Sequence, residues 1–186
     1  MATEIDRARR LFTVDEYDRM GVAGVFGPED RLELINGEIV EMSPIGPRHA
    51  ACVASLTKVL VIKIGERGVV WAQNPVTVPR HSKPQPDVAV LRARSYRDGH
   101  PEPDDVFLLI EVAETSLAYD RGVKRDLYAR AGIAEYWIVD TDAETVEVFR
   151  RPAAGGYGET RRMTRDDTIA PSAFPDVTIR VGDLFA

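Results

Sequence analysis

Two carboxylates of this chain stand in surroundings that are otherwise apolar. Asp87 precedes the apolar run 88–91, and Glu111 stands inside the apolar run 107–112. A charge in a buried strand is costly unless it is paired or bound to a metal ion. If the two strands are neighbours, both carboxylates meet near the strand ends, where their oxygens would suit the oxygen-only coordination of Mg²⁺. In the alternative interpretation, Asp87 caps a turn and Glu111 pairs with an arginine.

Lys124 is a third candidate, on a segment with helical periodicity that follows the Glu111 strand. It lies four residues after Asp120, so both side chains share one face of the predicted helix. A lysine near an activated water can orient the attacking hydroxide and offset the negative charge that develops on a phosphate. The alternative is an exposed Asp120–Lys124 pair, which would contribute only roughly a few tenths of a kcal/mol.

The N-terminal part of the chain predicts a short helix followed by a hairpin. Residues 13–16 have the pattern of a capping box, which opens a helix that one of the following glycines ends. Residues 31–35 and 38–42 alternate between polar and apolar types on either side of Asn36-Gly37. That pattern is typical of a β-hairpin with a two-residue turn.

A second, longer helix is expected over about 48–66, with Gly68 as its end. Its apolar residues repeat at helical spacing and are numerous enough to predict burial on most sides. Residues 69–78 then predict a strand interrupted at Asn74-Pro75.

The remaining elements predict the core that positions the candidate residues. Strands are expected over 87–91, 106–112, 134–140 and 145–150, with a helix over 120–131 that buries Val123, Leu127 and Ala131, and Gly132 as its C-cap. Tyr136 and Trp137 are expected in the core, and the tail 157–186 predicts edge strands with an apolar anchor at Leu184-Phe185. This order predicts an α/β fold with a mixed sheet. We expect one domain over 1–186, with its core at about 11–185.

Several motifs occur in order along the chain. They are RLELINGE at 31–38, MSP at 42–44 with His49, PDVAV at 86–90, LIEV at 109–112, Asp120-Arg121 with Lys124 and Tyr128, and GIAEYWIVD at 132–140. Pro86-Asp87 with the later Glu111 resembles the PD-(D/E)XK motif of restriction-endonuclease-like nucleases. The whole set resembles the Uma-two family of restriction endonucleases.

The resemblance implies a restriction-endonuclease-like mixed β-sheet flanked by helices, with an N-terminal helix and β-hairpin. It implies an endonuclease that hydrolyses phosphodiester bonds of nucleic acid, with DNA as the expected substrate. Asp87 and Glu111 would bind Mg²⁺, for which Mn²⁺ could substitute, and Lys124 would be the catalytic lysine. Glu33 would supply a further acidic group, reaching the metal through water. The alternative function is a catalytically silent module that binds nucleic acid or protein.

The sequence departs from the simplest form of the motif at Ala113, where the motif lysine would stand two residues after Glu111. The resemblance places that lysine on the following helix, at Lys124. For Glu33 the alternative is an exposed hairpin position. For His49 a helix cap or surface position is the commoner outcome, with a role in the site as the second possibility.

Composition limits the other classes of function. The single cysteine, Cys52, excludes an intrachain disulfide and a thiolate metal cluster, and no stretch approaches the length of a membrane span. These features predict a cytoplasmic protein. The net charge of −6 argues against a simple basic nucleic-acid binder, although carboxylates that hold a metal contribute to it. We expect a homodimer or higher symmetric oligomer, formed partly by the strands around 134–150.

Overall fold

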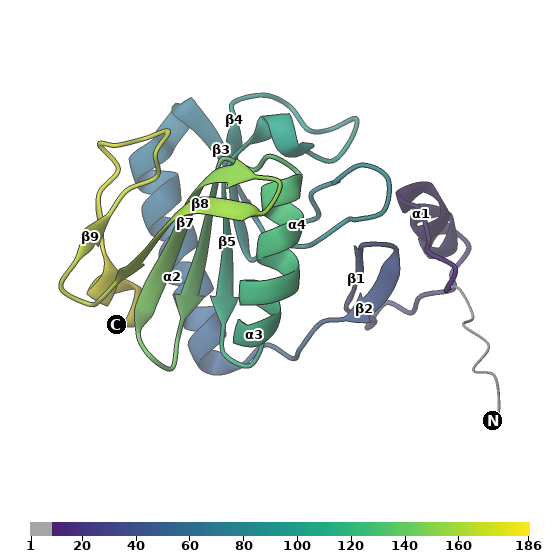
Figure 1. Ribbon diagram of the computed structural model, residues 1–186, viewed down its shortest axis with the longest axis horizontal. Helices are drawn as coiled ribbons and strands as arrows, with labels where there is room; N and C mark the ends of the chain where they lie inside the picture. Colours follow the sequence, from purple (N-terminus) through teal and green to yellow (C-terminus); the bar gives the residue numbers. More distant parts are fainter. Residues whose placement is uncertain (1–8) are drawn as a thin grey trace.

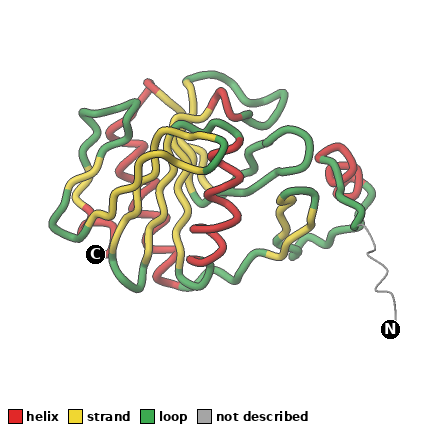
Figure 2. The backbone as a smooth tube through the Cα atoms, viewed as in Figure 1, coloured by secondary structure: helices red, strands yellow, loops and turns green. Residues whose placement is uncertain are grey.

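A six-stranded sheet forms the main body of the protein in a computed structural model that describes residues 9–186 (Figures 1 and 2). Its strands lie in the order β3-β4-β5-β6-β7-β8, and β5–β6 is the parallel pair. The strand bounds are β3 (Gly68–Ala72), β4 (Val88–Arg92), β5 (Val106–Ala113), β6 (Glu135–Asp140), β7 (Thr145–Ala153) and β8 (Gly156–Met163). The expected mixed sheet flanked by helices is therefore confirmed.

Helices cover both faces of this sheet (Figure 1). One face packs against α2 (Pro47–Ile64), which the short turn η1 (Gly65–Arg67) joins to β3. The other face packs against the crossover between β5 and β6, which consists of α3 (Leu117–Tyr119), η3 (Asp120–Lys124) and α4 (Arg125–Arg130). A parallel pair of strands requires such a crossover.

The alternation of side chains along the central strands builds both layers of the core. On β4, Val88 and Val90 face α2, whereas Ala89 and Leu91 belong to the cluster on the α4 side. Both faces are covered, which explains why the strand is a continuous apolar run. Tyr136 and Trp137 of β6 are fully buried on opposite faces, as the sequence predicts.

The N-terminal part lies beside the sheet and attaches to the segment that precedes β4 (Figure 1). Helix α1 (Val14–Val22) opens with the predicted capping box at Thr13 and Glu16. The predicted hairpin consists of β1 (Leu32–Ile35) and β2 (Glu38–Glu41). Its turn residues have positive φ, 50° at Asn36 and 83° at Gly37, as a two-residue hairpin turn requires.

The hairpin is fixed to the body by backbone hydrogen bonds. The Lys83 amide donates to the Leu34 carbonyl at 2.7 Å, and the Gly37 amide donates to the His81 carbonyl. These bonds hold β1 next to the segment that leads into the start of β4. Glu33 of β1 is thereby placed beside the sheet.

Three predictions about α2 and the strand that follows it were wrong in detail. Only one face of α2 is buried, because Val61 and Ile62 are 51% and 70% exposed. The helix ends at Gly65, whose φ of 58° suits a glycine, and Gly68 instead opens β3. The strand predicted over 69–78 stops at Ala72, because the chain turns at Gln73, whose φ is 51°.

The helix predicted over 120–131 is also different. It begins at Leu117 and contains the π-helical segment η3. A π-helical turn shifts the faces of a helix relative to an ideal α-helix. Leu127 is buried as predicted, but Val123 is 38% exposed, while Asp120 and Lys124 are buried.

The edge argument for an oligomer surface at residues 134–150 does not hold, while the oligomer itself stays a prediction. Residues 134–150 form β6 and most of β7, which are interior strands, because β8 covers the far side of β7. The edges of this sheet are β3 and β8. This agrees with the edge strands predicted in the tail 157–186, because β8 lies at one edge of the sheet.

The chain ends in a short layer next to α2. It comprises the two-stranded sheet of β9 (Thr168–Ile169) and β10 (Ile179–Arg180) and the final turn η4 (Val181–Phe185). Leu184 is buried against the α2 side of the core, which confirms the predicted anchor. Within residues 9–186, none of the helices has the length and apolarity needed to cross a membrane.

Candidate functional site

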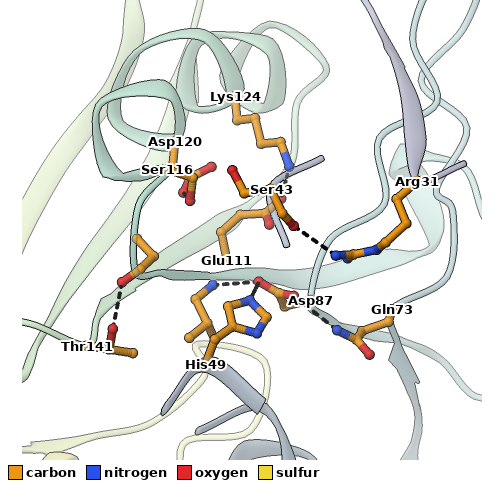
Figure 3. A network of polar contacts seen from close by, with 12 residues as sticks. Arg31, Ser43, His49, Gln73, Asp87, Glu111, Ser116, Asp120, Lys124 and Thr141 are labelled. Atoms are coloured by element: carbon orange, nitrogen blue, oxygen red, sulfur yellow. Dashed lines mark hydrogen bonds and ion pairs between the residues drawn. The ribbon is translucent and has the colours of Figure 1, made fainter. Parts of the chain in front are cut away.

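Asp87 and Glu111 meet at one end of the sheet. In the antiparallel β4–β5 ladder Val88 pairs with Ile110, so Asp87, one residue before β4, stands opposite Glu111. The backbone amide of Val112 donates to Asp87 Oδ2 at 2.8 Å, which ties the two positions together. Both carboxylates line a cavity of about 280 Å³ (Figure 3).

Lys124 reaches the same cavity from η3. Its Nζ lies 3.1 Å from Glu111 Oε1 and 3.1 Å from Glu33 Oε1. Lys124 is 5% exposed and Glu33 is 3% exposed. The structure therefore overturns three alternatives: an exposed pair of Lys124 with Asp120, an exposed hairpin position for Glu33, and an arginine partner for Glu111.

Two further contacts fix the carboxylates that flank Lys124. The hydroxyl of Tyr128 donates to Glu111 Oε1 at 2.7 Å, and the backbone amide of Gln85 donates to Glu33 Oε2 at 3.1 Å. Tyr128 had no predicted role beyond its place in the family motif. Its position four residues after Lys124 is the signal that could have placed it beside Glu111.

Asp120 is a fourth buried carboxylate in the lining of the cavity. Its Oδ2 accepts a hydrogen bond of 2.5 Å from the hydroxyl of Ser116, and its backbone carbonyl accepts one from Tyr136. Sequence reasoning considered Asp120 only as a partner for Lys124. Its burial shows that η3 turns this acidic side chain inward together with the lysine.

His49 joins the site from the first turn of α2. Its Nε2 lies 3.0 Å from Asp87 Oδ2 (Figure 3), and its side chain is largely buried. The interpretation as a surface residue or helix cap is wrong, because the ring contacts a carboxylate of the cavity.

Burial and ion pairing shape the electrostatics of the cavity. Burial raises the pKa of Glu111 well above its usual range, and the nearby Lys124 only partly opposes this. The pKa of Asp120 is raised for the same reason. Burial alone would lower the pKa of Lys124, but attraction by Glu111 and Glu33 outweighs it, so the pKa of the lysine is raised. The ammonium group is therefore held in its charged form.

The donor set suits a hard divalent cation. Glu33, Asp87, Glu111 and Asp120 line the cavity, and Lys124 is the cation buried among them. In the part of the chain that the structure describes, no three His, Cys, Asp or Glu side chains converge as a ready-made metal cluster. Mg²⁺ does not need one, since it usually binds through one or two carboxylates and keeps several waters. Asp87 and Glu111 fit that mode.

Arginine and hairpin residues form the outer wall of the cavity. Arg31 lies at the cavity beside β1, and its guanidinium donates to the Ser43 carbonyl at 2.8 Å (Figure 3). Sequence reasoning did not single out Arg31, because nothing in its type or spacing shows that the hairpin folds over the strand ends.

The side chains that could act as a nucleophile do not form a catalytic set. Ser116 donates to Asp120, and burial raises the pKa of the Cys52 thiol to about 12. A thiol with such a pKa is almost entirely protonated at neutral pH and is a poor nucleophile. In the described part of the chain, neither Ser116 nor Cys52 is therefore placed as a nucleophile.

Comparison with known proteins agrees with this geometry. The chain matches the model of the Uma2 family, described as "Putative restriction endonuclease", over residues 14–182. It is also similar in fold to a solved structure titled as a "putative nuclease belonging to DUF820" from Anabaena variabilis ATCC 29413. That likeness has a TM-score of 0.74 at 21% identity and covers 94% of this chain and 97% of the other. No curated protein matches the chain.

The family match spans the hairpin, the strand ends and the crossover that together build the cavity. The chain belongs to the Uma2 family of restriction-endonuclease-like proteins.

Proposed function

We propose that this protein is a Mg²⁺-dependent endonuclease that hydrolyses phosphodiester bonds of nucleic acid, with DNA as substrate. The observation that carries the proposal is the set of buried carboxylates around Lys124 in one cavity. Membership of a family described as "Putative restriction endonuclease" supports the same class of reaction.

Asp87 and Glu111 would hold the cation. They stand opposite each other on neighbouring strands, and each has an oxygen that is engaged by other groups of the protein. When bound, Mg²⁺ supplies Lewis-acid polarisation of a phosphoryl oxygen and makes water a nucleophile at neutral pH. The ammonium group of Lys124 lies between Glu33 and Glu111. Glu33 would therefore contact the hydration shell of the cation rather than the cation itself.

Lys124 would stabilise the negative charge that develops on the phosphate during attack. The ammonium group is fixed by Glu33 and Glu111 at 3.1 Å each, and a preorganised cation needs no rearrangement at the moment of reaction. Tyr128 and Lys124 both donate to Glu111 Oε1. The carboxylate is thus held in one orientation, with Oε2 left for the cation.

DNA is proposed as the substrate from the family description "Putative restriction endonuclease", and arginines near the cavity would contact its phosphates. Arg31 lines the cavity, and Arg48 stands at the start of α2 in ion pairs with Glu114 and Asp142. Arginine is the side chain best suited to contact phosphate with two parallel hydrogen bonds. These residues could position the backbone phosphates on either side of the scissile bond.

A cleavage assay tests this proposal. The purified protein is incubated with plasmid DNA, duplex and single-stranded oligonucleotides and RNA in Mg²⁺, in Mn²⁺ and in EDTA. We expect cleavage of DNA that depends on the cation and disappears in Asp87→Asn. The matched control is Asp176→Asn, an exposed aspartate paired with Arg67 outside the cavity. Cleavage in EDTA, or equal cleavage by Asp87→Asn, contradicts the proposal, and metal binding without cleavage of any substrate favours the silent module.

A further inference from the structure

The two oxygens of Asp87 have different surroundings. Oδ2 accepts the Val112 backbone amide at 2.8 Å and lies 3.0 Å from His49 Nε2. Among residues 9–186, Oδ1 has only the Gln73 side-chain amide as a partner, at 3.5 Å, which is the long limit of a hydrogen bond. The two directions in which Oδ2 best accepts hydrogen bonds are therefore occupied, and Oδ1 is the oxygen that remains available.

The surroundings of the second ring nitrogen, Nδ1, indicate which nitrogen of His49 donates to Asp87. Nδ1 is buried and, among the described residues, has no hydrogen-bond partner. A proton on Nδ1 alone would leave that N–H unpaired and would set the lone pair of Nε2 against a carboxylate oxygen. A proton on Nε2 makes the bond to Asp87 and leaves only Nδ1 without a partner, whereas the other tautomer leaves Nδ1 unpaired and also loses the bond to Asp87. The geometry therefore favours donation from Nε2 to Asp87 Oδ2.

The backbone around His49 holds the ring rigidly. His49 lies in the first turn of α2, two residues after Pro47, and the same helix packs Val53 and Leu56 into the core. The ring is thus positioned by a helix that is fixed to the sheet, and Val112 is fixed by β5. Asp87 therefore contacts two elements, α2 and β5, that pack against each other.

We propose that His49 is a positioning residue, which saturates Asp87 Oδ2 so that Asp87 presents Oδ1 alone to the divalent cation. This inference rests on the proposed function, because it assigns a task to His49 within the same site. Outer contacts of this kind commonly set the orientation and basicity of a metal ligand. Its consequence is that Asp87 binds the cation through one oxygen.

The test compares His49→Leu and His49→Gln by titration calorimetry with Mn²⁺, beside unfolding curves in EDTA. Loss of such an outer contact typically weakens metal binding about 10–100-fold, and we expect this loss in His49→Leu. His49→Gln can still donate from its amide nitrogen to Oδ2 and should keep most of the affinity. The matched control is His81→Leu, because His81 Nδ1 lies 2.9 Å from the Phe12 carbonyl, outside the set of residues that line the cavity.

Equal Mn²⁺ affinity in wild type, His49→Leu and His81→Leu overturns the positioning role while leaving the proposed metal site intact. No Mn²⁺ binding by the wild-type protein overturns the metal site and this inference together, so the two failures are distinguishable. A drop in melting temperature without a change in affinity would show a purely structural histidine and also overturns the inference. If His49→Leu does not fold, His49→Ala replaces it.

A second readout needs neither variant nor metal. The ¹⁵N shifts of the His49 ring in the metal-free protein report which nitrogen carries the proton. We expect a proton on Nε2, the nitrogen that faces Asp87 Oδ2. A proton on Nδ1 alone contradicts the geometry from which the inference is drawn.

Discussion

Glu111 and Glu135 are buried carboxylates on the neighbouring strands β5 and β6, yet their surroundings differ in kind. Because the two strands are parallel, Glu111 near the end of β5 and Glu135 at the start of β6 lie toward opposite ends of the sheet. One end carries the cavity described above, and the other carries a closed polar cluster.

Glu135 is fully matched by donors. Its Oε1 accepts from Trp137 Nε1 at 2.7 Å and from Arg150, and its Oε2 accepts from the Ser172 backbone amide at 2.6 Å. Arg150 stands directly opposite Glu135 in the β6–β7 ladder. One carboxylate therefore meets one guanidinium and two neutral donors, which is a balanced, structural arrangement.

Glu111 is not balanced in this way. It shares Lys124 with Glu33, while Asp87 and Asp120 line the same cavity, and burial raises the pKa of Glu111. The comparison teaches that burial of a carboxylate does not by itself indicate function. The surplus of carboxylates over local cations distinguishes the cavity from the Glu135 cluster, and it is the feature on which the proposed cation site rests.

The largest expected effect is on the cleavage rate. Asp87→Asn should abolish cleavage, and Lys124→Ala should lower the rate about 10²–10³-fold while sparing metal binding, because it removes charge stabilisation rather than a ligand. Lys124→Arg should restore little of the cleavage rate, because the planar guanidinium group does not replace the compact charge of the ammonium group. Glu135→Gln, assayed where it remains folded, should keep the wild-type rate. A reduced rate in Glu135→Gln would remove the distinction between the two regions.

The next effect is stabilisation by the cation. A ligand that binds only the folded state at 100 times its Kd stabilises it by about 2.7 kcal/mol. We expect Mn²⁺ to raise the unfolding free energy of the wild type and of Glu135→Gln, but not of Asp87→Asn. Urea unfolding with and without Mn²⁺ measures this, and a shift of equal size in Asp87→Asn would place the ion elsewhere.

A smaller effect is expected for the same substitution at the two glutamates in EDTA. In Glu135→Gln the new amide must face one of three donors, which should cost roughly 2 kcal/mol. In Glu111→Gln the carbonyl can still accept from Tyr128, while Lys124 keeps Glu33, so the unfolding free energy should change much less. The reverse order in urea unfolding would show that the cavity, and not the Glu135 cluster, is the structural ion-pair site.

The smallest effect concerns pH and Asp120. Its pKa is raised in the folded protein by burial, so its contribution to stability is complete below the ordinary aspartate value of 3.8 and is lost as pH rises through the folded pKa. In EDTA, Asp120→Asn should therefore gain stability relative to the wild type as pH increases from acidic to neutral. A difference in unfolding free energy that does not vary with pH would contradict the raised pKa.

Much of the fold was predictable because it depends on local pattern. The Asn36-Gly37 turn fixes the hairpin, and the continuous apolar runs before and around Glu111 are what doubly covered strands require. The carboxylates were visible for the same reason, since a charge inside such a run has to be explained by a partner or an ion.

The rest depends on contacts that no local pattern encodes. The contact between His49 and Asp87 joins residues 38 apart in sequence, and the ion pair between Lys124 and Glu33 joins the crossover to the hairpin. The π-helical turn that exposes Val123 and buries Lys124 is likewise set by packing. An edge strand was expected in the tail, but its pairing with β7, which makes β7 an interior strand, was not predicted from the sequence.

The most direct test of the comparison is a crystal soaked in Mn²⁺ and measured for anomalous scattering. The account predicts an anomalous peak in the cavity, in contact with Asp87 and Glu111, and none beside Glu135. A cavity without a peak at millimolar Mn²⁺, or a peak bound at the Glu135 cluster, would contradict the claim that the surplus of carboxylates around Lys124 is a cation site.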